Sequence, residues 1–258
     1  MTKIHPTAIV NPNAKLGENV EIGPYVIIEG DVEIGDGSVI MNHACLYNGA
    51  RIGKNVKIFQ ASSIANAPQD LKYANEKTYF YVGDNTVIHE YVTLHRGTAE
   101  TGFSRIGSDC LLMAYSHVAH DTVVGDHCIL ANAVQLAGHV TIEDWVIIGG
   151  ITPVHQFCKV GKHSMVGGGY RVNVDVPPFV MAAGEPIKYS GLNSIGLRRR
   201  GFTAEQIQDI KNVYFILYLS KLNFAEAKTK VKEELGDNWA AKEILTFFES
   251  SNRVGFKA

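Results

Sequence analysis

Residues 106–141 read IGSDCL LMAYSH VAHDTV VGDHCI LANAVQ LAGHVT, six consecutive groups of six residues that each open with Ile, Leu or Val. The same period extends outward in both directions, from Ile4 to Val166, and the fifth position of most groups is small or Val. A period of six fits neither a 3.6-residue helix nor a simple two-sheet sandwich. It is typical of a parallel β-helix, in which each repeat is a short strand and a turn.

Three such hexads would form one triangular coil, with the leading aliphatic side chain of each hexad pointing inward. The narrow interior has no room for a second large side chain, which explains the small fifth residue. Turns between the faces need compact residues or positive φ, and Gly, Asn and Asp are frequent there. The array predicts roughly eight stacked coils, a prism about 40 Å tall.

Two insertions interrupt the period, at residues 70–81 and 100–105, and each is a whole number of hexads long. We expect both to be loops that leave the prism, and long loops on a rigid scaffold often carry function. We therefore divide the chain into a parallel β-helix domain, residues 1–185, and a C-terminal α-helical domain, residues 186–258.

The helical domain shows ordinary helix signals. Thr203 and Gln206 form a capping box, Asn223 can cap a second helix that Gly236 ends, and a third helix is expected over about 239–250. These helices would cover one open end of the prism, where strand edges are otherwise unpaired.

Composition limits the partners. The net charge is -2, which implies no nucleic-acid partner, although the cluster Arg198-Arg199-Arg200 suits an acidic partner or a phosphate. We see neither a signal peptide nor a membrane span, so no stable membrane insertion is expected. The four Cys show no disulfide or CxxC spacing, and three occupy the small inward position. A reducing, cytoplasmic location is therefore expected.

Five of the histidines are expected to lie along one edge of the prism when each is assigned to its coil. The hexads that contain His120, His139 and His155 begin 18 residues apart, and with both insertions excised the hexad that contains His95 falls on the same face. His117 ends the preceding hexad, at the adjoining corner. An imidazole can take a proton from a hydroxyl nucleophile and return it to a leaving group.

Three neighbouring residues suit acyl transfer. His120 is a candidate general base, and the adjacent Asp121 could orient it. Gly138, one coil above, is placed to offer a backbone N–H to an oxyanion. A row of histidines that only fills an oligomer contact remains an alternative at this point.

Several longer strings carry a family resemblance. They are Gln69-Asp-Leu-Lys-Tyr73, Leu94-His-Arg-Gly97, His117-Val-Ala-His-Asp121, Leu136-Ala-Gly-His139, Val154-His-Gln-Phe157 and Leu197-Arg-Arg-Arg-Gly-Phe202. Over nearly its whole length the chain resembles the hexapeptide-repeat acyltransferases, and specifically the UDP-N-acetylglucosamine O-acyltransferases that begin lipid A synthesis.

The resemblance implies a left-handed coil, although crossovers between parallel strands are generally right-handed. It also implies a homotrimer with sites in the clefts between prisms. The reaction would move a 3-hydroxyacyl group from the phosphopantetheine arm of acyl carrier protein to the 3-hydroxyl of UDP-N-acetylglucosamine. No metal and no other cofactor would be needed.

The resemblance also implies residue roles. His120 would be the general base, Asp121 would orient it, and Gly138 would supply the oxyanion N–H. The residues expected to line the sugar, acyl and carrier-arm pocket are Gln69, Asp70, Lys72, His95, His117, His139, His155 and Gln156. Asn193, Arg199 and Arg200 would hold the nucleotide, and Gly168, in a run of three glycines, would leave room for the acyl chain. The family pattern leads us to expect an acidic residue at position 195, where this chain has Ile.

Three alternatives stay open. The related N-acyltransferase of the same pathway acylates a sugar amine, but such chains usually carry an extra N-terminal domain. A trimer that resembles the γ-class carbonic anhydrases would bind zinc, and His117-x-x-His120 permits that interpretation. A nonenzymatic scaffold is the third. The sequence does not decide the acyl length or whether the acceptor carries a 3-hydroxyl or a 3-amino group.

Overall fold

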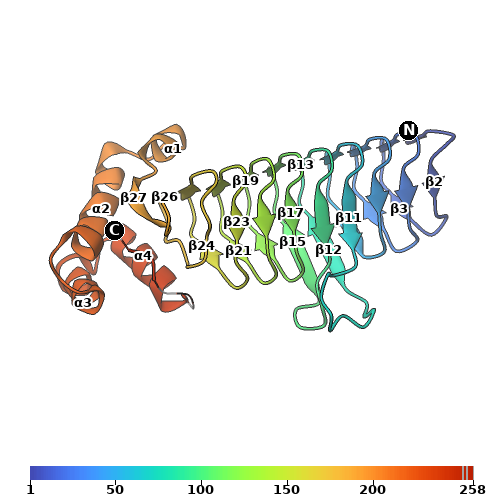
Figure 1. The fold of residues 1–258 in the computed structure, drawn as a ribbon. Coiled ribbons are helices and arrows are strands. Elements are labelled where there is room, and N and C mark those ends of the chain that lie inside the picture. The colour runs from blue at the N-terminus through green and yellow to red at the C-terminus, as the bar shows by residue number, and fades with distance from the viewer. Residues whose placement is uncertain (252, 254, 258) are drawn as a thin grey trace.

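The computed structural model describes residues 1–251, 253 and 255–257, and it forms a left-handed parallel β-helix followed by α-helices (Figure 1). Short strands stack into three sheets, one for each face of a triangular prism. Sheet A contains β1 (Lys3–Ile4), β4 (Glu21–Ile22), β7 (Val39–Ile40), β10 (Lys57–Ile58), β13 (Val87–Ile88), β16 (Leu111–Leu112), β19 (Ile129–Leu130), β22 (Ile147–Ile148), β25 (Met165–Val166), β26 (Val180–Ala183) and β27 (Lys188–Leu192).

The other two sheets contain the remaining strands. Sheet B contains β2 (Ile9–Val10), β5 (Ile27–Ile28), β8 (Cys45–Leu46), β11 (Ser63–Asn66), β14 (Thr93–His95), β17 (His117–Val118), β20 (Gln135–Leu136) and β23 (Pro153–Val154). Sheet C contains β3 (Lys15–Leu16), β6 (Glu33–Ile34), β9 (Ala50–Ile52), β12 (Tyr79–Val82), β15 (Phe103–Ile106), β18 (Val123–Val124), β21 (Thr141–Ile142) and β24 (Lys159–Val160).

The hexad determines what lies inside. Each two-residue strand ends on its leading aliphatic residue, which is buried in the middle coils, as at Val118 and Leu136. The fifth residue is also buried, and the fourth lies in the turn with positive φ, as at Asp121 (φ 57°) and His139 (φ 60°). Turns of this kind put the side chain of the fourth residue of each hexad at a corner of the prism.

The predicted stacking is confirmed. Leu94 pairs with Val118, Val118 with Leu136, and Leu136 with Val154, all in sheet B. Both insertions leave the prism at the corner that joins sheet B to sheet C, in successive coils, and they project together from one edge in Figure 1.

The predicted loop boundaries, 70–81 and 100–105, are wrong at both ends. Tyr79–Val82 pairs with both β9 and β15, and Phe103–Ile106 continues that ladder. These strands have four residues, twice the usual length, because the returning chain begins to pair two residues before the usual start of a strand. The first loop is therefore residues 67–78 and the second is residues 96–102.

The helical part follows an antiparallel pair, β26 and β27. It contains α1 (Ser194–Arg199), α2 (Ala204–Tyr214), a π-helical segment (Phe215–Leu219), α3 (Phe224–Leu235) and α4 (Trp239–Glu249). The capping box at Thr203 and the Asn223 cap are confirmed, whereas the sequence analysis missed α1 and the β26–β27 pair. β27 lies beyond residue 185, where the sequence analysis divides the domains.

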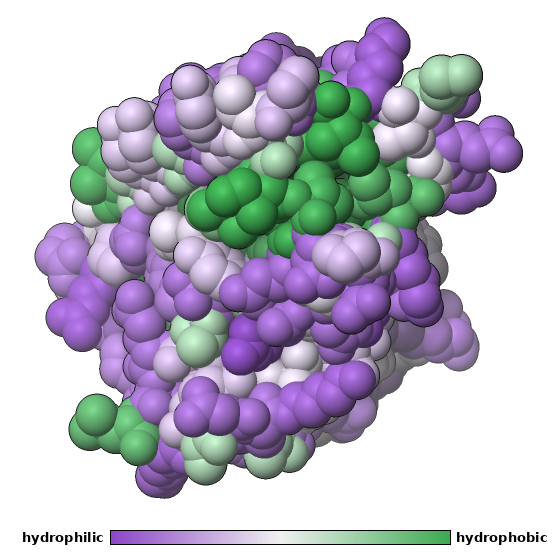
Figure 2. All heavy atoms as spheres, turned by 90° about the vertical axis from the view of Figure 1, so that its right-hand side faces the viewer, coloured by the Kyte–Doolittle hydropathy of each residue, from purple (hydrophilic) through white to green (hydrophobic). Residues whose placement is uncertain are grey.

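The helices pack on the C-terminal coils of the prism. The Tyr214 hydroxyl donates to the Pro178 carbonyl, and Lys162 pairs with Glu243. At the opposite end, β1, β2 and β3 each pair on one side only, and Figure 2 shows apolar side chains exposed there. Among the described residues, we find no helix with the length and apolar character that a membrane crossing requires.

Candidate functional site

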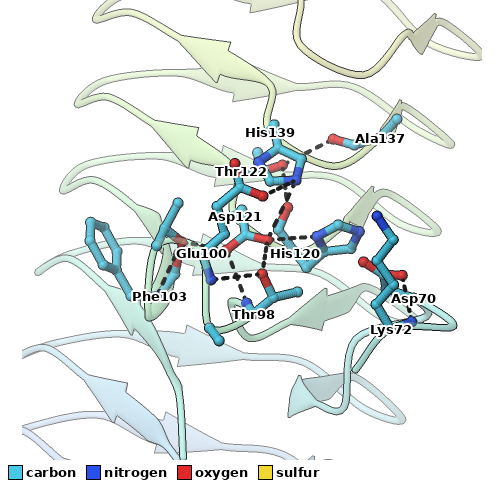
Figure 3. Close-up of polar contacts among 12 residues, drawn as sticks. Asp70, Lys72, Thr98, Glu100, Phe103, His120, Asp121, Thr122, Ala137 and His139 are labelled. Carbon is cyan, nitrogen blue, oxygen red and sulfur yellow. Dashed lines mark hydrogen bonds and ion pairs between the residues drawn. The ribbon is translucent and has the colours of Figure 1, made fainter. Parts of the chain in front are cut away.

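The candidate site lies at the corner between sheets B and C, where both loops leave the prism. It is a pocket of about 760 Å³. Six residues predicted from the sequence line it together: Gln69, Asp70, Lys72, His120, His139 and Gln156. The first loop supplies three of them, and three successive turns of the prism supply the others. Figure 3 shows the His120 ring directed toward the side where Asp70 and Lys72 lie.

Asp121 is the buried anion of this site. Its carboxylate accepts hydrogen bonds from the Thr98 N–H (2.9 Å), the Thr98 hydroxyl (2.8 Å), the Thr101 hydroxyl and His120 Nδ1 (2.7 Å). Burial alone would raise the pKa of this carboxyl, but the hydrogen bonds from Thr101, His120 and Thr98 outweigh burial and lower its pKa. Asp121 is therefore ionised at neutral pH.

His120 has the geometry of a general base. Because Nδ1 is occupied by the Asp121 carboxylate, Nε2 is the nitrogen left to accept a proton. Only 15% of the His120 side chain is exposed, and its ring lies edge-to-face against the His139 ring, with centroids 5.2 Å apart. His139 in turn stacks on Phe157 at 4.6 Å.

Gly138 packs directly on the His120 ring. A Cβ at this position would lie 2.7 Å from Cε1 and 2.8 Å from Nε2 of His120, so only Gly fits beside the unmoved ring. The Gly138 N–H donates no hydrogen bond within the described part of the chain. At the next corner, the equivalent N–H groups of Ser108 and Asp126 each donate to an Asp of the following coil. The N–H of Gly138 therefore remains available to a ligand.

His95 and His117, which were also predicted from the sequence, are not among the described residues that line the pocket. His95 Nδ1 donates to the Ala67 carbonyl at 2.6 Å, and His117 Nδ1 contacts the Thr93 hydroxyl at 2.7 Å. Their ring centroids lie 5.1 Å apart. Burial, together with the neighbouring His95 and His120, lowers the pKa of His117 to about 4. Burial also lowers the pKa of His95. Both rings are therefore neutral near pH 7.

The remaining predicted residues lie elsewhere. His155 is half-buried one coil above His139, and its Nδ1 contacts the Gln156 carbonyl. Gly168 lies at the corner between sheets A and B. Arg200 and Asn193 contact His163 at the corner between sheets C and A, and Arg199 is exposed nearby on α1. Ile195, also on α1, is 66% exposed. One chain thus distributes these residues over all three corners.

His120, Asp121 and His139 also form the kind of cluster that could hold a metal ion. The hydrogen bonding of Asp121 argues against this use. A carboxylate offers about four lone-pair positions, and four donors already occupy them here. Because four donors surround it, the Asp121 carboxylate has no lone-pair position left for a metal ion in this arrangement.

Comparisons with known proteins identify the family of the chain. Residues 175–256 match a family described as UDP-N-acetylglucosamine O-acyltransferase, domain 2, and residues 103–138 match the bacterial transferase hexapeptide. A chain from Herminiimonas arsenicoxydans named acyl-[acyl-carrier-protein]–UDP-N-acetylglucosamine O-acyltransferase is 47% identical, with 98% of each chain covered. The chain belongs to this family.

Solved structures of family members have the same fold. The UDP-N-acetylglucosamine acyltransferase of Bacteroides fragilis is 45% identical, with a TM-score of 0.96 over 99% of this chain and 100% of that one. The corresponding protein of Acinetobacter baumannii is 42% identical, with a TM-score of 0.94 over 99% of each chain. The fold and the family predicted from the sequence are both confirmed.

Several residues that line or support the pocket were not predicted from the sequence. Phe157 stacks on His139, and Glu76 links the two loops by accepting from the N–H groups of Ala74 and Ala99. Thr98 and Thr101 hold Asp121. The only sequence signal for Thr98 and Thr101 is their position inside or beside an insertion, because the hexad repeat does not extend into the loops.

Proposed function

We propose that this chain transfers a 3-hydroxyacyl group from acyl carrier protein to the 3-hydroxyl of UDP-N-acetylglucosamine, the first step of lipid A biosynthesis. The observation that carries the proposal is the His120–Asp121 pair in a pocket, with Gly138 packed on the His120 ring. The names of the relatives at 47% and 48% identity, which specify this acyl donor and this sugar nucleotide, support the substrates.

His120 acts as the general base in the proposed reaction. Its Nε2 takes the proton of the sugar hydroxyl while the oxygen attacks the thioester carbonyl carbon. Asp121 stabilises the imidazolium that forms, and the Gly138 N–H donates to the oxyanion. The C–S bond then breaks, the new ester remains on the sugar, and His120 returns the proton to the departing thiolate.

The other residues bind substrate. Gln69, Asp70, Lys72, His139 and Gln156 contact the sugar or the carrier arm from the pocket wall, with His95, His117 and His155 around them. Gly168 leaves room for the acyl chain, and Asn193, Arg199 and Arg200 hold the nucleotide, since guanidinium groups suit phosphate. The proposal needs no resident metal or cofactor, because the acyl group arrives on the phosphopantetheine arm of its carrier. Nucleic acid and stable membrane insertion have no part in it.

A homotrimer would bring the three corners together. The outward side chains on the C-terminal half of sheet A are apolar and only partly exposed: Val87, Leu111, Ile129, Ile147 and Met165. An apolar stripe of this kind suits contact with another copy. The nucleotide residues of one copy would then complete the pocket of its neighbour. A carrier-protein donor also suits a cytoplasmic location.

A competition assay tests the substrates. Purified protein is given acyl carrier proteins charged with 3-hydroxyacyl chains of several lengths, with UDP-N-acetylglucosamine or its 3-amino analogue as the acceptor. We expect an ester product on the 3-hydroxyl, identified by mass spectrometry. A product formed only with the amine would instead indicate the N-acylating reaction, and no product with either acceptor would refute the proposal.

A further inference from the structure

Three of the four hydrogen bonds to Asp121 come from the second loop. The Thr98 N–H and the Thr101 hydroxyl reach Oδ1, and the Thr98 hydroxyl reaches Oδ2, which also accepts from His120. We infer that Thr98 and Thr101 are positioning residues, which hold Asp121 as an oriented anion behind His120. This inference rests on the proposed role of His120 as general base.

Asp31 provides a comparison within the same chain. It occupies the same hexad position at the same corner as Asp121, several coils earlier. Its carboxylate pairs with Arg51 and Lys77, and 36% of the side chain is exposed. The Asp121 side chain is fully buried, and among the described residues its partners include no Lys or Arg.

The kind of donor matters for the chemistry. Hydroxyl and amide donors stabilise an anion without cancelling its charge, whereas a Lys or Arg would neutralise it. Asp121 therefore keeps a full negative charge, which stabilises the His120 imidazolium as it forms. A cation in place of the threonines would oppose the protonation of His120.

Thr101 has one hydroxyl proton and two acceptors within reach, Asp121 Oδ1 and the Phe103 carbonyl. The carboxylate is the stronger acceptor, because hydrogen bonds to ionised groups are about twice as strong as neutral ones. The proton therefore lies toward Asp121. Thr98 is buried, whereas Thr101 is exposed, so Thr98 is the better residue to test first.

The test compares Thr98→Val with Thr98→Ser and Thr86→Val in acyl transfer. Thr86 is a matched control, since its buried hydroxyl donates to the Gly107 carbonyl at 2.8 Å, away from the pocket. Thr98→Val should lower kcat about tenfold or more and change KM little, as expected for a lost hydrogen bond to a charged group. Thr98→Ser should restore kcat, and Thr86→Val should leave it unchanged.

A second measurement does not depend on turnover. Without the Thr98 hydroxyl the carboxylate is less stabilised, so the His120–Asp121 pair binds its next proton more tightly. The acid limb of kcat/KM should move to higher pH, and the 13C signal of the Asp121 carboxyl should titrate at higher pH, because the Thr98 hydroxyl helps to lower its pKa. Thr101→Val should shift both in the same direction, which covers the case that Thr98→Val does not fold.

The outcomes separate this inference from the proposed function. Wild-type kcat and an unshifted Asp121 titration in both Val variants would overturn the positioning role, even if His120→Ala is inactive. Full activity of His120→Ala would instead overturn the proposed base, and the inference with it.

Discussion

Gly138 lies one coil above His120 and touches its ring, so that any Cβ at residue 138 would fall within 2.7 Å of His120 Cε1. This contact joins the candidate base to the candidate oxyanion donor. The Gly138 N–H also has no hydrogen-bond acceptor among the described residues.

Gly138→Ala should therefore inactivate the enzyme without unfolding it. The added methyl group must displace the His120 ring, and a misplacement of about 1 Å can cost on the order of 10²-fold in rate. Acyl-transfer rates and thermal unfolding of the variant would check this.

Gly30→Ala is the matched control. Gly30 occupies the same hexad position at the same corner, but a Cβ there meets only the Asn11 side chain, at 3.2 Å. We expect wild-type activity from it. Equal rates for the two variants would show that the contact between Gly138 and His120 is not needed.

His120→Ala should lower turnover by roughly 10²–10⁴-fold, as expected for the loss of a general base. The melting temperature should change little, because the His120 side chain lies at a corner of the prism and outside its apolar core. His5→Ala, an exposed histidine near the N-terminus, is the control. A rate within a few-fold of the wild type would exclude His120 as the base.

The hexad repeat predicted most of the β-helix, but it did not predict the hydrogen bonds that hold the site residues in place. Periodicity decides which side chains point inward, so the pairing of Leu94, Val118 and Leu136 could be derived by counting. The counting also placed His95, His117, His120 and His139 near one another. The contacts of Thr98 and Thr101 could not be derived, because a loop's path is determined by tertiary hydrogen bonds and not by a repeat.

The tertiary contacts of the proposed nucleotide-binding residues also could not be predicted from the sequence. The string around Arg198–Arg200 suggested phosphate binding, but not that Asn193 is buried, caps α1 and donates to the His163 carbonyl. Such a role needs the three-dimensional arrangement of α1 above the last coil.

His163 should make stability depend on pH. Burial, with Arg200 and Lys162 nearby, lowers its pKa from 6.5 to about 4. Between about pH 4 and 6.5, His163 is therefore protonated in the unfolded chain and neutral in the folded chain. The contribution of His163 to stability should fall as the pH drops from about 6.5 to 4 and should be constant above that range.

His163→Phe should reduce this slope. Phe keeps the stacking on Phe179, and aromatic residues such as Tyr115 and Phe157 already adopt positive φ at the same hexad position. Urea unfolding of both proteins between pH 4 and 8 measures the effect. Parallel curves for the two proteins would show that His163 does not contribute.

Gly168→Met should shift acyl preference toward shorter chains, because a side chain there would occupy space that the proposal assigns to the acyl tail. A Cβ at this position lies 3.1 Å from the Gly150 carbonyl oxygen, so a small backbone adjustment accommodates it. Relative rates with donors of several lengths would check the shift. Unchanged selectivity would remove Gly168 from the acyl site.

Arg199→Ala tests whether two copies share a site. The exposed Arg199 lies on α1, near the corner between sheets C and A, whereas His120 lies at the corner between sheets B and C. If neighbouring copies complete each pocket, the His120→Ala and Arg199→Ala chains should each have low acyl-transfer activity when assayed alone. Denatured together and refolded as mixed oligomers, they should regain part of the wild-type activity, since some pockets then receive both native residues. Native mass spectrometry would establish that mixing occurred, and mixed oligomers with no recovered activity would show that one chain supplies both His120 and Arg199 to a pocket.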